Sequence, residues 1–176
     1  SGVMPAITTP FRADLSLDPA ALERHAAWLV EQGVTGIVPL GSLGESATLR
    51  FDEKIEVLRT VLKAVDARVP VVAGIAALST AESVDLARRA AEIGCRGLMV
   101  LPPYVDRPDA RELRAHFDAV LDATPLSSML YNNPIAYGVD YLPEEIVQLA
   151  EAHPNLQAVK ESSGDVRRIS TLKGLA

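Results

Sequence analysis

The stretch Leu-Gln-Ala-Val-Lys-Glu-Ser-Ser, residues 156–163, predicts a short buried strand with a lysine, Lys160, at its carboxyl end. A lysine is seldom fully buried without a partner or a chemical role. Partial desolvation of its ammonium group would lower the pKa and favour the neutral amine, which attacks a carbonyl and forms a Schiff base. Taken alone, the stretch favours a simpler interpretation, in which the strand ends at Val159 and Lys160 is a solvated loop cation.

The rest of the chain repeats the same unit, a short apolar strand followed by a helix. The Asp18-Pro19 pair predicts one helix start, and Ser79-Thr80-Ala81-Glu82 predicts another through a capping box. We expect a helix after each strand, the sixth beginning at Asp165. The predicted strands span residues 3–11, 36–40, 70–77, 97–102, 126–132 and 156–159.

Six strand–helix units with a repeat of about 30 residues indicate an α/β protein. The strands are apolar on both faces, which is typical of a parallel sheet covered by helices. An open doubly wound sheet and a (β/α)8 TIM barrel both fit this pattern. A barrel needs eight units, so residues 1–176 would be a single barrel domain that is incomplete at its C-terminal end.

Composition excludes several classes of function. The chain has 176 residues, 48% of them hydrophobic, and its net charge of -6 makes nucleic acid or an anionic membrane surface a poor partner. A single cysteine, Cys95, fits a reducing compartment, and no apolar run is long enough to span a bilayer, so we expect a cytoplasmic protein. His25, His116 and His153 lack metal-ligand spacing, so no metal site is expected.

Two other predicted strands end in residues that suit catalysis. Residues 41–46, Gly-Ser-Leu-Gly-Glu-Ser, let backbone N–H groups turn towards an anion, and a small carboxylate suits them better than a triphosphate. Tyr131, in Tyr-Asn-Asn-Pro at 131–134, carries a hydroxyl that can move a proton. A plain strand–helix turn and a packing tyrosine are the alternative interpretations.

Three motifs together resemble the dihydrodipicolinate synthase/N-acetylneuraminate lyase family, class I aldolase-like enzymes on a (β/α)8 barrel. The resemblance runs through the whole chain in order and spacing. It implies a barrel that continues beyond Ala176, no cofactor, and a homo-oligomer, either a tetramer or a dimer. The motifs are Gly41-Ser42-Leu43-Gly44-Glu45, Tyr131-Asn132-x-Pro134 and Val159-Lys160-Glu161.

The resemblance also implies roles for single residues. Lys160 would form a Schiff base with a 2-oxo acid such as pyruvate, and the protonated imine would act as an electron sink. Ser42 and the backbone N–H groups of Ser42 and Leu43 would hold the substrate carboxylate. Tyr131 would move the proton between substrate and Lys160, relayed through the Ser42 hydroxyl. Independently of the resemblance, Glu161 follows Lys160 directly, so strand alternation predicts that it points to the opposite side of the strand.

This sequence departs from the dihydrodipicolinate synthases at three places. They usually have two threonines at Ser42-Leu43, an arginine at Ala136 for the second substrate, and a second tyrosine where Val105 follows Tyr104. We therefore expect a Schiff-base lyase that performs aldol cleavage, dehydration or deamination of a hydroxylated 2-oxo or pyrroline carboxylate. Dihydrodipicolinate synthase proper is one alternative. A catalytically silent homologue or barrel fragment that binds a small carboxylate is another.

Overall fold

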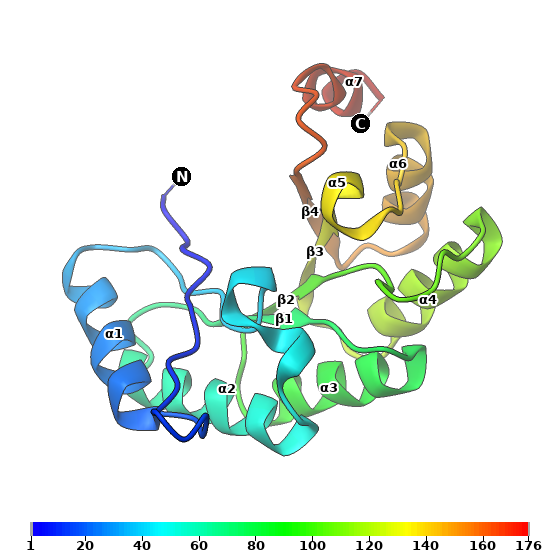
Figure 1. Ribbon diagram of the computed structural model, residues 1–176. Helices are drawn as coiled ribbons and strands as arrows, with labels where there is room; N and C mark the ends of the chain where they lie inside the picture. The colour runs from blue at the N-terminus through cyan, green and yellow to red at the C-terminus, as the bar shows by residue number, and fades with distance from the viewer. Residues whose placement is uncertain (1, 176) are drawn as a thin grey trace.

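The computed structural model describes residues 2–175, and its centre is a four-stranded parallel sheet (Figure 1). The strands follow one another in the order β1-β2-β3-β4 without a reversal. A doubly wound sheet reverses its order at a topological switch point, so the uninterrupted order is that of a barrel. The strands are β1 (Val72–Ile75), β2 (Gly97–Val100), β3 (Ser127–Asn132) and β4 (Leu156–Glu161).

The two strands predicted nearest the N-terminus form only isolated bridges. Ala6 pairs in parallel with Val38, and Ile37 pairs in parallel with Val71, so both segments continue the sheet beyond β1. Pro5 and Pro39 lack an N–H group and accept hydrogen bonds only, which interrupts a regular ladder. Six parallel segments therefore succeed one another in sequence order, as six units of a TIM barrel require.

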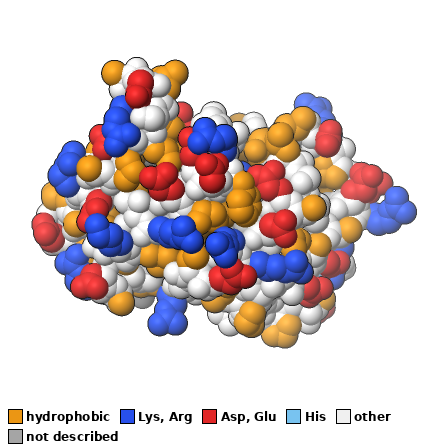
Figure 2. Space-filling view, turned by 90° about the horizontal axis from the view of Figure 1, so that it is seen from below, with side chains coloured by type: hydrophobic (Ala, Val, Ile, Leu, Met, Phe, Trp, Pro, Cys, Tyr) orange, Lys and Arg blue, Asp and Glu red, His pale blue; other side chains and the backbone are white. Residues whose placement is uncertain are grey.

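Helices follow the strands as predicted, and α1 to α4 lie along one side of the sheet in Figure 1. The Asp18 side chain accepts a hydrogen bond from the Ala21 N–H at the start of α1. Figure 2 shows basic and acidic side chains intermingled on the face seen from below. The helices are α1 (Pro19–Glu31), α2 (Phe51–Val65), α3 (Thr80–Glu92), α4 (Ala110–Asp122), α5 (Pro134–Tyr137), α6 (Pro143–Ala152) and α7 (Arg167–Leu175), with 3₁₀ turns η1 (Ser42–Gly44) and η2 (Ser46–Thr48).

β1, β2 and β3 bury most of both of their faces, whereas β4 buries only Leu156 and leaves Gln157 and Ala158 exposed. On β2, Leu98 and Val100 belong to the large cluster under the helices, whereas Met99 belongs to a smaller cluster that includes Tyr131. Successive side chains of a strand point to opposite faces, so the smaller cluster marks the inner face of the barrel. The prediction of buried strands is thus confirmed for β1 to β3 and wrong for β4, where the described chain provides no helix or strand that covers Gln157 and Ala158.

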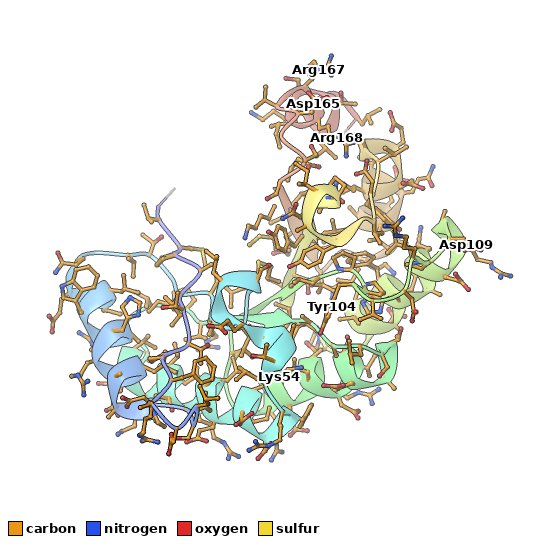
Figure 3. The ribbon with its side chains drawn as sticks, in the orientation of Figure 1. Lys54, Tyr104, Asp109, Asp165, Arg167 and Arg168 are labelled. Carbon is orange, nitrogen blue, oxygen red and sulfur yellow. The ribbon has the colours of Figure 1, made fainter. Side chains whose placement is uncertain are left out.

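The predicted capping box at the start of α3 is wrong in its second half. The Ser79 hydroxyl accepts a hydrogen bond from the Glu82 N–H, as expected. The Glu82 carboxylate, however, accepts a hydrogen bond from Lys54 Nζ at 3.2 Å. Lys54 is 3% exposed and also donates to the Ala76 carbonyl, so this buried ammonium group takes the carboxylate away from the cap (Figure 3).

Candidate active site

Lys160 and Tyr131 lie side by side at the carboxyl ends of β4 and β3. They are register partners in the parallel ladder, so their side chains leave the sheet on the same face. The Lys160 Nζ lies 4.0 Å from the centroid of the Tyr131 ring. β4 runs two residues past Val159, so the lysine stands on the strand, half-buried, and is not a loop cation.

The Tyr131 hydroxyl sits among groups that favour its ionised form. Burial raises the pKa of Tyr131, but Asn133, the Lys160 charge and the Ser42 and Ser162 hydroxyls together outweigh it and lower the pKa below its usual value. Asn133 Nδ2 donates to this hydroxyl at 2.9 Å. A phenol with a lowered pKa gives up its proton more readily, which suits proton transfer.

Ser42 and Leu43 open the 3₁₀ turn η1 directly after the second parallel segment. Both are exposed, and their N–H groups precede the first hydrogen bond of the turn, which Gly44 donates to the Gly41 carbonyl. Such leading N–H groups have no partner within a helical turn and are free to bind an anion. Glu45 adopts the left-handed conformation between η1 and η2, and α2 begins only at Phe51.

The Ser42 hydroxyl is hydrogen-bonded to the hydroxyl of Tyr137, a residue to which the sequence assigned no role. Tyr137 ends the short helix α5, in which Asn133 caps the first turn and Pro134 stands at its start. Gly138 closes the helix in the left-handed conformation. An Asn-Pro start and a glycine end four residues later are a readable helix signal, and it places Tyr137 beside the site.

Burial raises the pKa of Tyr137. The Ser42 hydrogen bond lowers it in part, and Tyr131 adds to the rise. Its ring meets the Tyr131 ring edge-on, with centroids 5.9 Å apart at an interplanar angle of 86°. The pKa values of two phenols in contact are therefore shifted in opposite directions, so Tyr131 ionises more readily than Tyr137.

Glu161 faces away from Lys160, as expected. Its carboxylate accepts hydrogen bonds from Asn132 Nδ2 at 3.1 Å and from the Ser163 N–H at 2.7 Å. Asn132 also donates to Asp140, which accepts hydrogen bonds from two nitrogens of Arg168. Arg168 lies on α7 (Figure 3). This polar network ties the ends of β3 and β4 to α7 behind the two candidate catalytic side chains.

A cavity of about 140 Å³ adjoins Ser42. Ser42, Ser46, Ala76, Leu101, Tyr104 and Tyr137 line it. Val105, which follows Tyr104, is 67% exposed, and Ala136 is also exposed. Tyr104, Val105 and Ala136 carry no positive charge, so these positions bring no cation to the cavity.

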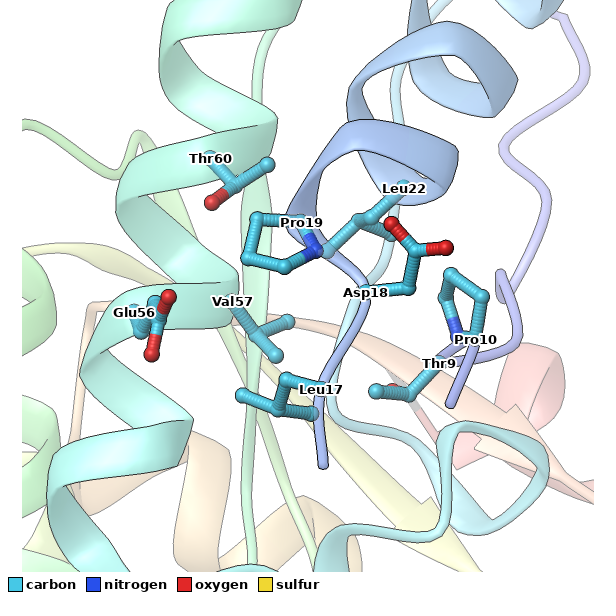
Figure 4. Close-up of a pocket in the computed structure, with 9 residues that line it drawn as sticks. All are labelled: Thr9, Pro10, Leu17, Asp18, Pro19, Leu22, Glu56, Val57 and Thr60. Atoms are coloured by element: carbon cyan, nitrogen blue, oxygen red, sulfur yellow. The ribbon is translucent and has the colours of Figure 1, made fainter. Parts of the chain in front are cut away.

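Other features of the described chain lie outside this site. The crevice between the start of α1 and α2 leaves no room for a water molecule (Figure 4). His116 and His153 are buried in hydrogen bonds to protein groups, and burial raises the pKa of Cys95 to about 12. Within residues 2–175, no helix is long and apolar enough to cross a membrane, and no three His, Cys, Asp or Glu side chains form a group that fits a metal ion.

Comparison with known proteins agrees with the fold and the motifs. The model of the dihydrodipicolinate synthetase family matches residues 1–176. A 4-hydroxy-tetrahydrodipicolinate synthase of Haloarcula marismortui is 43% identical over 171 residues, which are 97% of this chain and 55% of that protein.

Two solved structures superpose closely on this chain. The 4-hydroxy-tetrahydrodipicolinate synthase of Methylacidiphilum fumariolicum has a TM-score of 0.95 at 37% identity, over 99% of this chain and 58% of that one. YagE is an E. coli prophage protein of the dihydrodipicolinic acid synthase family, solved in complex with pyruvate. Its TM-score is 0.94 at 30% identity, over 99% of this chain and 58% of the YagE chain. The chain thus spans somewhat more than half the length of these relatives, and it belongs to the dihydrodipicolinate synthetase family.

Proposed function

We propose that the protein is a Schiff-base-forming lyase that acts on a 2-oxo acid through Lys160. The observation that carries the proposal is the pairing of Lys160 with Tyr131, an amine 4.0 Å from the ring of a phenol whose pKa is lowered. An amine nucleophile beside a proton-transfer group is what imine formation needs. The pyruvate bound to YagE supports this class of substrate.

In the proposed reaction, the Lys160 nitrogen bonds to C2 of the 2-oxo acid, and the carbonyl oxygen leaves as water. Tyr131 delivers a proton to that oxygen and later accepts one from the substrate. The protonated imine then accepts the electron pair released when a proton, or a carbon substituent, leaves C3. The N–H groups of Ser42 and Leu43, with the Ser42 hydroxyl, hold the carboxylate of the 2-oxo acid.

Deuterium exchange tests this proposal with pyruvate alone, whichever group the natural substrate carries at C3. In D₂O, the full-length protein should exchange the methyl protons of pyruvate, because the imine loses and regains a proton at C3. Lys160→Ala should abolish the exchange, whereas Lys63→Ala, at an exposed lysine that pairs with Glu23, should leave it unchanged. A folded wild-type protein that exchanges no protons would refute the lyase and favour a silent carboxylate-binding homologue.

A second candidate function is 4-hydroxy-tetrahydrodipicolinate synthase, the name carried by the Haloarcula relative. The residues do not favour it, because Ala136 supplies no cation for a second carboxylate. Adding aspartate semialdehyde to the protein with pyruvate decides between them. Rapid condensation would establish the synthase, and its absence in a protein that still exchanges pyruvate protons would leave cleavage, dehydration or deamination.

The assembly and extent of the protein are part of the same proposal. Residues 1–176 would be one barrel domain, continued by further chain in a homo-oligomer, a tetramer or a dimer. Light scattering of the full-length protein measures the oligomer directly, and a monomer would contradict this part.

A further inference from the structure

We propose that Tyr137 positions the Ser42 hydroxyl for proton transfer at Tyr131 and Lys160, so that all three hydroxyl groups of the relay come from one chain. This inference rests on the proposed Schiff-base chemistry and adds a residue to it. It starts from the hydrogen bond between the Ser42 and Tyr137 hydroxyls.

Ser42 needs a partner to act with a fixed direction. It is exposed at the start of a short 3₁₀ turn, and a serine hydroxyl rotates freely unless a hydrogen bond holds it. Tyr137 can hold the Ser42 hydroxyl in one direction because neighbouring rings confine its own ring. The ring packs edge-on against Tyr131 and tilts against Tyr104, with the Tyr104 centroid 6.3 Å away.

The local backbone fixes where the Tyr137 ring stands. Asn133 Oδ1 accepts a hydrogen bond from the Ala136 N–H, and Pro134 presets the first turn of α5. Asn133 Nδ2 donates to the Tyr131 hydroxyl at the same time. One asparagine therefore holds both the helix that carries Tyr137 and the phenol of Tyr131.

The protonation states give the hydrogen bonds a direction. Burial keeps the Tyr137 phenol protonated by raising its pKa, so its O–H is available to donate to Ser42 Oγ. The Ser42 hydrogen is then free to point to the Tyr131 oxygen, where it favours the phenolate and lowers the pKa of Tyr131. When Ser42 gives its proton to Tyr131, Tyr137 replaces it, and solvent then returns a proton to Tyr137. Tyr137 is therefore unchanged overall.

Tyr137→Phe in the full-length protein is the direct test, since it removes the hydroxyl and keeps the ring. We expect pyruvate proton exchange to fall about tenfold to a hundredfold. The limb of the pH–rate profile that reports Tyr131 should move to higher pH, because Ser42 no longer steadies the phenolate. A change that only loosened packing would lower the rate without moving that limb.

The matched control is Tyr141→Phe, the same chemical change four residues further along the chain. Tyr141 is buried against Phe117, outside the site, and its loss should leave the exchange rate and its pH profile unchanged. Ser42→Ala should slow exchange at least as much as Tyr137→Phe, because it also removes a hydroxyl that holds the carboxylate. The double variant should be no slower than Ser42→Ala alone, because Tyr137 acts through that hydroxyl.

Three results would overturn the inference. Tyr137→Phe could exchange protons at the wild-type rate, its pH profile could stay in place, or its effect could multiply with that of Ser42→Ala. Each of these leaves the proposed function standing, provided that exchange in the wild type still depends on Lys160. If the wild type itself exchanges no protons, the proposed function fails and this inference fails with it.

Discussion

A methyl group at Gly74 would strike the backbone that leads into the Ser42 turn. A Cβ atom built on Gly74 in β1 would lie 2.3 Å from the Leu40 carbonyl oxygen and 2.5 Å from its carbon. Real Cβ atoms essentially never approach another heavy atom within 3.0 Å, so Gly74→Ala must push the two segments apart by at least 0.7 Å. The obstacle is backbone, which no side-chain rotation relieves.

That displacement should reduce both stability and activity. The Gly74 N–H donates to the Pro39 carbonyl at 2.9 Å, and the shift stretches this bond and overpacks the core. Overpacking typically costs about 1–3 kcal/mol of the free energy of unfolding. Ser42 follows Leu40 by two residues, and a misplacement approaching 1 Å slows a reaction by about a hundredfold.

Urea unfolding and pyruvate proton exchange measure the two effects in the full-length protein. Gly174→Ala in α7 is the matched control, because a Cβ there meets nothing within 4 Å. It should stabilise the helix by up to about 1 kcal/mol and leave exchange unchanged. The reasoning is refuted if Gly74→Ala unfolds at the wild-type urea concentration and exchanges protons at the wild-type rate.

Three further predictions concern single side chains. Arg168→Ala should cost about 1 kcal/mol in urea unfolding, since it removes two bonds to Asp140 of 2.6 and 2.7 Å. Arg167→Ala, which removes an exposed ion pair with Asp165, should cost less than Arg168→Ala. Burial lowers the pKa of His116, so the unfolded chain binds a proton that the folded chain refuses, and the free energy of unfolding should fall as the pH drops below the usual value of 6.5. His116→Gln should flatten that dependence in urea titrations, and an unchanged slope would contradict it. Tyr131→Phe should slow pyruvate exchange by about a hundredfold or more, and a rate within twofold of wild type would exclude Tyr131 as the proton carrier.

The regular part of the fold could be predicted because local pattern and tertiary packing agree there. The helices that begin after Asp18 and after Ser79 start where the sequence predicts, and the strands near 97–102 and 126–132 are present in shortened form. The N-terminal strands could not be placed so well, because their prolines break the ladder that their apolar residues favour. The Glu82 cap failed because a buried lysine 28 residues earlier competes for the carboxylate.

The candidate site could be predicted only in part. Lys160 and Tyr131 were both placed at strand ends, and the register that sets them side by side follows from a parallel sheet in sequence order. The partner of Ser42 was not predictable, because Tyr137 reaches it across 95 residues of sequence through a four-residue helix. No periodic pattern reports a contact of that kind.

The measurement that tests the central claim most directly is the mass of the protein after pyruvate and borohydride. Borohydride reduces the imine to a stable amine, and peptide mapping then locates the modified lysine. Our account predicts one pyruvate-derived adduct on Lys160 in the full-length protein, and none on Lys54, Lys63 or Lys173. An adduct on another lysine, or none on a folded protein that still exchanges pyruvate protons, would contradict the assignment of Lys160.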